Sequence, residues 1–255
     1  MESKIIISPT FSFRGIILEE FPRVKIEVKK MKKETKNNFA GDKKFGKWIF
    51  SDLENRLVEK TIHLIPKWLE TYHLTMMTLL WSVVIVLAGY LAEENINWFW
   101  LVSAMIVAQY ITDLYDGKIG RLRNTGLVKW GYFMDHFLDY VFLCSVLIAY
   151  SFLVPNEFRL LGLFTVMVII GFMINFFLFF ATTNRFKISH LGIGPTESRL
   201  IFIVANTLLI IFGAKYFLIV LPYIGAVVLL ALVIVIWQSH KETWKMDMEN
   251  KKKNG

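Results

Sequence analysis

Four aspartates are the residues of this sequence whose type and spacing could do chemistry. Asp113 and Asp116 lie three residues apart, and Asp135 and Asp139 lie four residues apart. On a helix, side chains at these spacings share one face, so each pair predicts two carboxylates on one side of its helix. Carboxylate oxygens are the ligands that Mg²⁺ and Mn²⁺ prefer. The spacing therefore predicts a divalent metal site with Mg²⁺ or Mn²⁺ as cofactor.

Long apolar segments must position these acids. A membrane-spanning helix needs about 20 mostly apolar residues. Such segments lie near residues 74–92, 96–116, 127–153, 158–182, 197–213 and 216–237. The first aspartate pair lies at the end of the second segment, and the other pair lies in the first half of the third. An ionised Asp in a membrane costs up to about 2.5–3.5 kcal/mol when it lies at the middle of the bilayer. We expect an all-α integral membrane protein of about six transmembrane helices, with bound cations compensating the acids.

Composition supports a membrane protein. Hydrophobic residues make up 55% of the 255 residues, aromatic residues 15%, and the mean hydropathy is +0.48, above the usual range of soluble domains. The net charge is +8, but the basic residues lie at the chain ends and between apolar segments. We therefore expect membrane lipids, not nucleic acid, as partners. The single cysteine, Cys144, excludes an intrachain disulfide, and no apolar run predicts a cleavable signal peptide.

Charge asymmetry predicts the orientation. The connection with Glu93 and Glu94 is acidic, and the connection near Pro155 is nearly neutral. The fifth connection is a very short turn with Lys215 alone, and we expect these three connections outside. The second and fourth connections and the tail are basic, through Lys118, Arg121, Arg123, Lys129, Arg185, Lys187, Lys241, Lys245 and Lys251 to Lys253. Because positive residues stay on the cytoplasmic side, we expect cytoplasmic N and C termini. The multi-pass chain would lie in the cell or inner membrane with its active site facing the cytoplasm.

Four regions follow along the chain. We expect a basic cytoplasmic arm over 1–46, an amphipathic juxtamembrane helix over 47–72, a six-helix membrane domain over 73–238 and a basic cytoplasmic tail over 239–255. Residues 4–28 alternate weakly and could form a strand or hairpin. The juxtamembrane helix has two interpretations, because its apolar residues recur at helical spacing among charged ones. It lies in the membrane interface, or it packs on the catalytic body.

The residues around the aspartates resemble a known signature. Asp113, Asp116, Gly117, Gly120, Arg121, Gly131, Asp135 and Asp139 match the pattern DxxDGxxAR followed by GxxxDxxxD. The chain is therefore identified as resembling the CDP-alcohol phosphotransferases. Gly120 stands where the family has alanine, and nine residues separate Arg121 from Gly131 where the family more often has seven or eight. The longer gap falls at the connection between the helices, where Thr125 lies.

The resemblance implies a fold, an activity and residue roles. The family is similar to this chain over about residues 72–238 and moves a phosphoalcohol group from a CDP-linked donor to an alcohol, releasing CMP. It implies Asp113, Asp116 and Asp135 as main metal ligands and Asp139 as catalytic base beside the metal. The implied donor contacts are Gly117, Gly120, Arg121, Thr125 and Gly131. We also expect a homodimer.

A second motif follows the fourth apolar segment. Residues 194–197 read Gly-Pro-Thr-Glu and precede Ser198 and Arg199. This stretch resembles a segment of choline and ethanolamine phosphotransferases. On that interpretation the acceptor pocket is lined by Arg185, Lys187, Glu197 and Arg199. The alternative is that this stretch only begins a helix, because Pro and Glu are common in a helix's first turn. On that alternative Arg185 and Lys187 are ordinary positive charges of a cytoplasmic connection.

Several functions remain open from the sequence. Our first hypothesis is a phospholipid-synthesis transferase that uses CDP-diacylglycerol and a small alcohol acceptor; the alternative uses CDP-choline or CDP-ethanolamine with diacylglycerol. An ion transporter is a remote alternative, because the fourth and sixth segments lack the polar path that transport requires. A non-catalytic membrane scaffold is disfavoured further, because nothing would compensate the charge of the four aspartates. The acceptor stays open among serine, glycerol phosphate, an inositol derivative and another polyol.

Overall fold

A computed structural model describes residues 44–45, 51–123, 127–184, 186–187 and 194–254. The chain divides into two compact units, residues 1–39 and 40–255, and every described residue belongs to the second. The predicted hairpin over 4–28 lies outside the described residues, as do Thr125 and Arg185.

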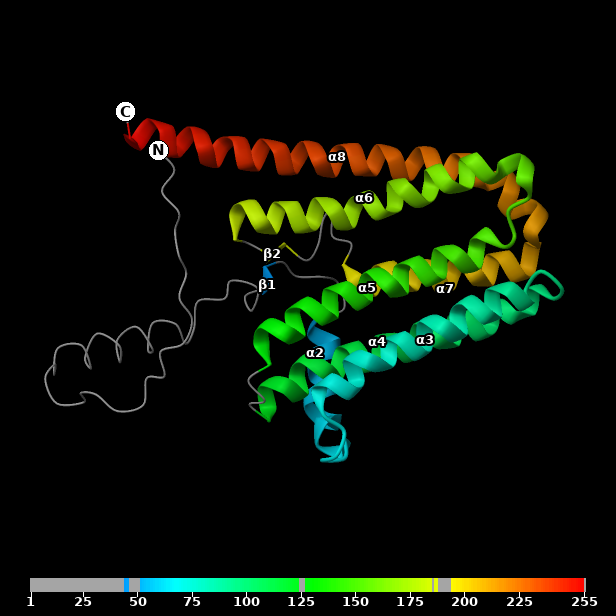
Figure 1. Ribbon diagram of the computed structural model, residues 1–255, viewed down its shortest axis with the longest axis horizontal. Helices are drawn as coiled ribbons and strands as arrows, with labels where there is room; N and C mark the ends of the chain where they lie inside the picture. Colours follow the sequence, from blue (N-terminus) through cyan, green and yellow to red (C-terminus); the bar gives the residue numbers. More distant parts are fainter. Residues whose placement is uncertain (1–43, 46–50, 124–126, 185, 188–193, 255) are drawn as a thin grey trace, which may run out of the picture. The chain divides into compact units, whose positions relative to one another are not determined.

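Seven α-helices form the described part of the chain (Figure 1). They are α2 (Ser51–Thr61), α3 (Thr71–Leu91), α4 (Phe99–Leu122), α5 (Val128–Ser151), α6 (Arg159–Thr183), α7 (Pro195–Phe212) and α8 (Ala214–Asn254). Single 3₁₀ turns cover Ile62–Leu64, Ile96–Trp98 and Asn156–Phe158. Two-residue strands β1 (Lys44–Phe45) and β2 (Phe186–Lys187) pair in parallel. The predicted all-α class is confirmed, since this short pairing is the only sheet in the described residues.

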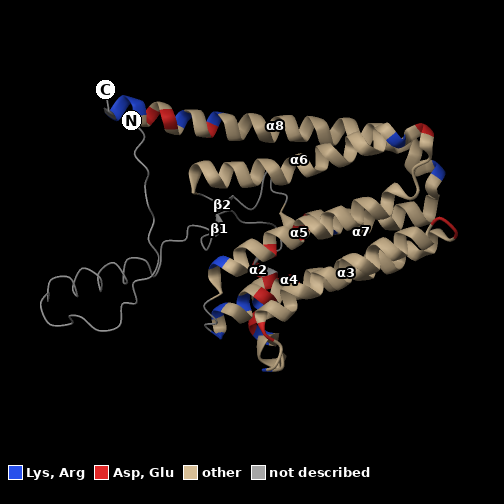
Figure 2. Cartoon of the chain, viewed as in Figure 1, with Lys and Arg blue, Asp and Glu red and all other residues tan. Residues whose placement is uncertain are grey.

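Each of the six predicted apolar segments coincides with one helix from α3 to α8. Within the described residues, five helices are long and apolar enough to span a membrane, and α4 is not among them. It has 24 residues, but Gln109, Asp113 and Asp116 interrupt its apolar sequence. Figure 2 shows long uncharged stretches in these helices, with charged residues concentrated near helix ends. The chain is therefore an integral membrane protein, and its site residues explain why its second segment is the least apolar.

The helix α8 continues beyond the predicted span. It runs without a break past residue 238 to Asn254 and contains Pro222. Its last part holds Lys and Glu residues, which are good helix formers, and Lys245 lies 3.8 Å from Glu249 one turn later. The predicted basic tail is thus a helical extension of the last membrane helix.

Close packing joins α3, α4 and α5. Ile85, Val102, Ile106 and Val146 from these helices are fully buried in one cluster. A methyl group added at Gly89 of α3 would lie 2.4 Å from the Cα of Ala149 in α5, so the two backbones touch. In a membrane, helices gain little from hydrophobic burial and depend on such contact between small residues. This packing fixes α5 beside α4 and so positions the aspartates of both.

The juxtamembrane helix α2 packs on the end of α4. Val58 is fully buried, Lys118 donates from Nζ to Asn55 Oδ1 at 2.8 Å, and the hydroxyls of Thr61 and Tyr115 lie 2.5 Å apart. Of the two interpretations of this helix, the structure has it packed on the catalytic body. Beyond it, Leu64 and Trp68 are more than two thirds exposed, which leaves apolar side chains available to the membrane interface.

Candidate metal and substrate site

Three carboxylates from two helices meet at one place. Asp113 from α4 and Asp135 and Asp139 from α5 each offer an oxygen, and these oxygens lie within 4.8 Å of one another. The four-residue spacing places the two α5 side chains on one face, and that face is turned toward α4. Ligands around Mg²⁺ stand about 2.0–2.1 Å from the ion, so a group this small fits one. The three aspartates could hold a divalent metal.

Asp116 is not one of the three clustered carboxylates, although it lies close enough to Asp113 and Asp139 to interact with them electrostatically. Its side chain is buried, with 6% of the residue exposed, and its Oδ2 accepts a hydrogen bond from Thr75 Oγ1 at 3.0 Å. Thr75 belongs to α3, so this carboxylate faces a different helix from the one that Asp113 faces. The structure brings three of the four predicted aspartates together and fixes the fourth against α3.

A buried arginine joins the carboxylates from α7. Arg199 donates from Nη2 to Asp113 Oδ2 at 2.7 Å and lies 3.5 Å from Asp139 Oδ1. Its Nε donates to Gln109 Oε1 at 2.8 Å, and its guanidinium carbon lies 5.8 Å from the centre of the Tyr110 ring. An opposite charge at hydrogen-bond distance stabilises buried ions. Arg199 therefore offsets part of the negative charge of the aspartates.

The start of α7 positions Arg199 beside the aspartates. Gly194 precedes the helix, Pro195 begins it, and the Gly194 N–H donates to Glu197 Oε2 at 2.9 Å. Glu197 is buried and performs the helix-start role that the sequence left as an alternative for this segment. Arg199 follows two residues later and reaches the carboxylates. Of the four predicted acceptor residues, Glu197 thus caps the helix and Arg199 places its cation at the carboxylates.

Backbone stays accessible at two of the predicted donor contacts. Among the described residues, a methyl group added at Gly131 would meet no atom within 4 Å, and one added at Gly117 would meet only Arg121 Nη2, at 3.8 Å. Arg121 is exposed and lines a groove of about 520 Å³ between α2 and the end of α4. The other lining residues of this groove are Asn55, Val58, Glu59, Ile62, Lys118 and Leu122. Within the described residues, these two glycines therefore leave space beside the backbone.

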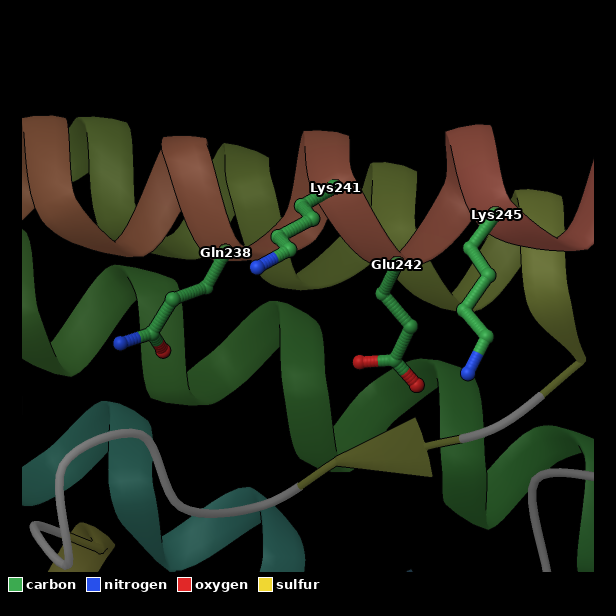
Figure 3. A pocket seen from close by; sticks show the side chains of 4 residues that line it. All are labelled: Gln238, Lys241, Glu242 and Lys245. Atoms are coloured by element: carbon green, nitrogen blue, oxygen red, sulfur yellow. The ribbon is translucent and has the colours of Figure 1, made fainter.

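The described residues include two further predicted residues and a second pocket. Gly120 lies in the last turns of α4, and Lys187 lies in β2. A pocket of about 360 Å³ on α8 is lined by Gln238, Lys241, Glu242 and Lys245 (Figure 3). All four side chains extend from this one helix, and none belongs to the carboxylate site.

Comparison with known protein families shows which family the chain belongs to. The family model of the CDP-alcohol phosphatidyltransferases matches residues 68–237, two thirds of the chain. The chain belongs to the CDP-alcohol phosphatidyltransferase family. The predicted resemblance is confirmed, and the chain is a transferase of substituted phosphate groups in phospholipid biosynthesis. No curated protein and no solved structure matches the chain significantly. The matched range contains the three clustered aspartates and Arg199, and it excludes α2.

In this phosphatidyltransferase, several polar residues around the aspartates were missed by sequence reasoning. Gln109 is 1% exposed and donates from Nε2 to Asp139 Oδ1 at 3.4 Å. A glutamine inside an apolar segment, four residues before Asp113 and so on its helix face, was the available signal. Thr75 and Glu54 carried no such signal. Thr75 hydrogen-bonds to Asp116, 41 residues away, and Glu54 accepts hydrogen bonds from Tyr110 and Thr196, which are 56 and 142 residues away.

Proposed function

We propose that this enzyme transfers a phosphatidyl group from CDP-diacylglycerol to a small alcohol and releases CMP. The observation that supports this best is the meeting of three carboxylates with one buried arginine at the end of apolar helices. A lipid-linked pyrophosphate needs positive charge at the membrane surface, and the aspartates can recruit that charge as a bound divalent metal.

We further propose Mg²⁺ or Mn²⁺ as cofactor, held by Asp113, Asp135 and Asp139. Asp116 is proposed as an additional ligand, with the hydroxyl of Thr75 orienting its carboxylate in the way that outer hydrogen bonds orient metal ligands. The metal, when bound, neutralises phosphate charge as the leaving group departs. The donor set is made of hard oxygens, which suits these ions and not a thiolate-binding metal.

Asp139 is proposed as the general base. Its carboxylate lies one turn beyond Asp135 and receives hydrogen bonding from Gln109, which holds it toward the site. It removes the proton of the acceptor hydroxyl, the acceptor oxygen bonds to the phosphorus of the phosphatidyl group, and the bond from that phosphorus to the CMP oxygen breaks. CMP leaves with the electron pair of that bond. General-base catalysis contributes about 10²–10⁴-fold to the rate.

The donor nucleotide is proposed to lie along the groove beside Arg121. Arg121 projects there from the end of α4, and the accessible backbone of Gly117 and Gly131 allows the pyrophosphate to come close to both helices. Gly120 and Thr125 are proposed as further donor contacts. Glycine is the residue that permits such close approach, because it carries no Cβ.

The acceptor is proposed to lie on the side of Arg199. Arg185 and Lys187 are proposed to line the same pocket, and Glu197 to shape it through the start of α7. If the acceptor is phosphorylated, Arg199→Ala raises its KM far more than that of the CDP donor. Unchanged KM values for both substrates would show that Arg199 does not bind the acceptor.

The choline and ethanolamine phosphotransferase reaction is the second candidate. The observation that favours it is the Gly-Pro-Thr-Glu start of α7, whose Thr196 and Glu197 are both buried beside the site. The test offers the purified full chain CDP-diacylglycerol with a panel of radiolabelled alcohols, and CDP-choline or CDP-ethanolamine with diacylglycerol. Product from CDP-diacylglycerol alone supports our first proposal. Product from the aminoalcohol donors alone overturns it in favour of the second.

The membrane orientation and assembly are also proposals. The basic connections support cytoplasmic termini and a cytoplasmic active site. In a Cys144→Ser background, single cysteines placed near Lys36 and Lys251 should react with an impermeant reagent only after the membrane is opened. Labelling of either one from outside intact cells refutes the orientation. We propose a homodimer, for which crosslinking in native membranes should give a band of twice the chain mass.

A further inference from the structure

The helix α2 lies outside the range matched by the family, yet one of its acids enters the site region. Glu54 is 4% exposed, and its Oε1 accepts hydrogen bonds from Thr196 Oγ1 at 2.6 Å and from Tyr110 Oη at 3.0 Å. These donors belong to α7 and α4. One carboxylate oxygen of α2 thus joins the two helices that carry Arg199 and Asp113.

Both hydrogen-bond donors lie on the helices that surround Arg199, one on α4 and one on α7. Tyr110 presents its ring to the guanidinium, 5.8 Å from the ring centre. Thr196 lies three residues before Arg199 on α7, one turn of the helix less about 60°. Any shift of either donor would move the surroundings of the guanidinium. Glu54 therefore contacts two residues beside Arg199, whose guanidinium itself donates to Gln109 and Asp113.

Attachment of α2 does not by itself explain this acid. A buried carboxylate is costly unless it is hydrogen-bonded, and apolar residues often stabilise a helix contact equally well. Val58 already buries an apolar side chain of α2, and Asn55 and Thr61 already hydrogen-bond to α4. The acid adds hydrogen bonds that reach α4 and α7 together.

We propose that Glu54 is a positioning residue for Arg199, and that α2 forms part of the acceptor side of the transferase site. Through Thr196 and Tyr110 the carboxylate fixes the two walls beside the guanidinium, so that Arg199 is already placed when the acceptor arrives. Pre-placement of a charged group lowers the cost of ordering it in the complex. The catalytic consequence rests on the proposed function of Arg199, whereas the structural coupling does not.

The first test measures that coupling without any substrate. Thermal unfolding midpoints are recorded in EDTA for wild type, Glu54→Ala, Arg199→Ala and the double variant. If Glu54 acts on Arg199, the double variant's shift is smaller than the sum of the single shifts by about 2–4 °C. Asp52→Ala is the matched control, because Asp52 also lies in the first turn of α2 but is exposed. Its shift should add to that of Arg199→Ala; additivity for Glu54→Ala as well would overturn the proposal.

The second test separates positioning from general support. In CMP-release assays, Glu54→Ala should raise the acceptor KM by about fivefold or more and leave the donor KM within about twofold. Glu54→Gln retains an accepting oxygen and should recover part of the loss, and Asp52→Ala should match wild type. Equal changes in both KM values would mean that α2 only supports the fold. If wild type itself releases no CMP, the proposed function fails, and the thermal cycle still decides the role of Glu54.

Discussion

Replacing Arg199 by glutamine removes the only positive charge that the described residues place within ion-pair distance of Asp113 and Asp139. Its Nη2 lies 2.7 Å from Asp113 and 3.5 Å from Asp139, so the guanidinium acts as an internal counter-charge. The variant Arg199→Gln leaves the carboxylates facing one another with that charge gone. We expect the metal-free protein to lose stability and metal to restore it.

The magnitude follows from burial. Breaking a buried ion pair by removing one partner costs about 3–5 kcal/mol. The Asp113 and Asp139 side chains are 23% and 33% exposed, so water screens part of that loss. We therefore expect about 2 kcal/mol, which lowers the thermal midpoint of a chain of this size by about 4–8 °C. A divalent ion carries two positive charges, so bound Mg²⁺ should more than replace the lost one.

The assay compares thermal unfolding in EDTA and in saturating Mg²⁺ for wild type and Arg199→Gln. The variant should unfold earlier in EDTA, and Mg²⁺ should stabilise it more than it stabilises wild type, because binding to the folded state raises the midpoint. Arg159→Gln removes an exposed arginine and should behave as wild type. Equal Mg²⁺ shifts for Arg199→Gln and wild type would refute the idea that Arg199 and metal serve the same carboxylates.

Three further predictions concern the aspartates and glycines. In turnover and donor-binding assays across a magnesium titration, Asp139→Asn should lower kcat at least about 10²-fold with donor affinity within a few fold, whereas Asp113→Asn should weaken metal and donor binding. Rescue of Asp139→Asn by metal alone would contradict its role as base. Gly89→Ala forces a methyl group to within 2.4 Å of the α5 backbone and should destabilise by about 1–3 kcal/mol in thermal unfolding, while Gly162→Ala, with its nearest atom at 3.4 Å, should not. Equal midpoints for those two variants would refute the close contact of α3 and α5. Gly117→Ala should unfold no earlier than wild type, since its methyl group meets one atom at 3.8 Å and alanine favours helix, yet it should raise the donor KM; an unchanged KM would exclude close approach of the donor there.

The spacing of the aspartates predicted part of the site but not all of it. Four residues advance a helix by slightly more than one full turn, so Asp135 and Asp139 had to share a face, and the structure has both in the group with Asp113. Three residues fall about 60° short of a turn. That offset lets Asp116 reach Thr75 on α3, a partner 41 residues away that helix periodicity cannot identify.

Helix positions were predictable because a membrane span needs a long apolar sequence. The number of helices that are apolar enough to span a membrane was harder to predict, because α4 carries polar residues such as Gln109 at the site. Contacts between helices were beyond the sequence. Glu54 and Thr196 are 142 residues apart, and the amphipathic pattern around Glu54 indicated a helix without indicating which helix it would contact.

The most direct test of the account is metal-dependent CMP release by the purified full chain in lipid nanodiscs. CDP-diacylglycerol and the acceptor panel are supplied in EDTA, Mg²⁺ or Mn²⁺, and Asp135→Asn is run beside wild type. We predict release that requires both a divalent ion and an alcohol, and that falls at least about 10²-fold in Asp135→Asn. Release by wild type that is equally fast in EDTA, or undiminished in Asp135→Asn, would contradict a metal site at these carboxylates.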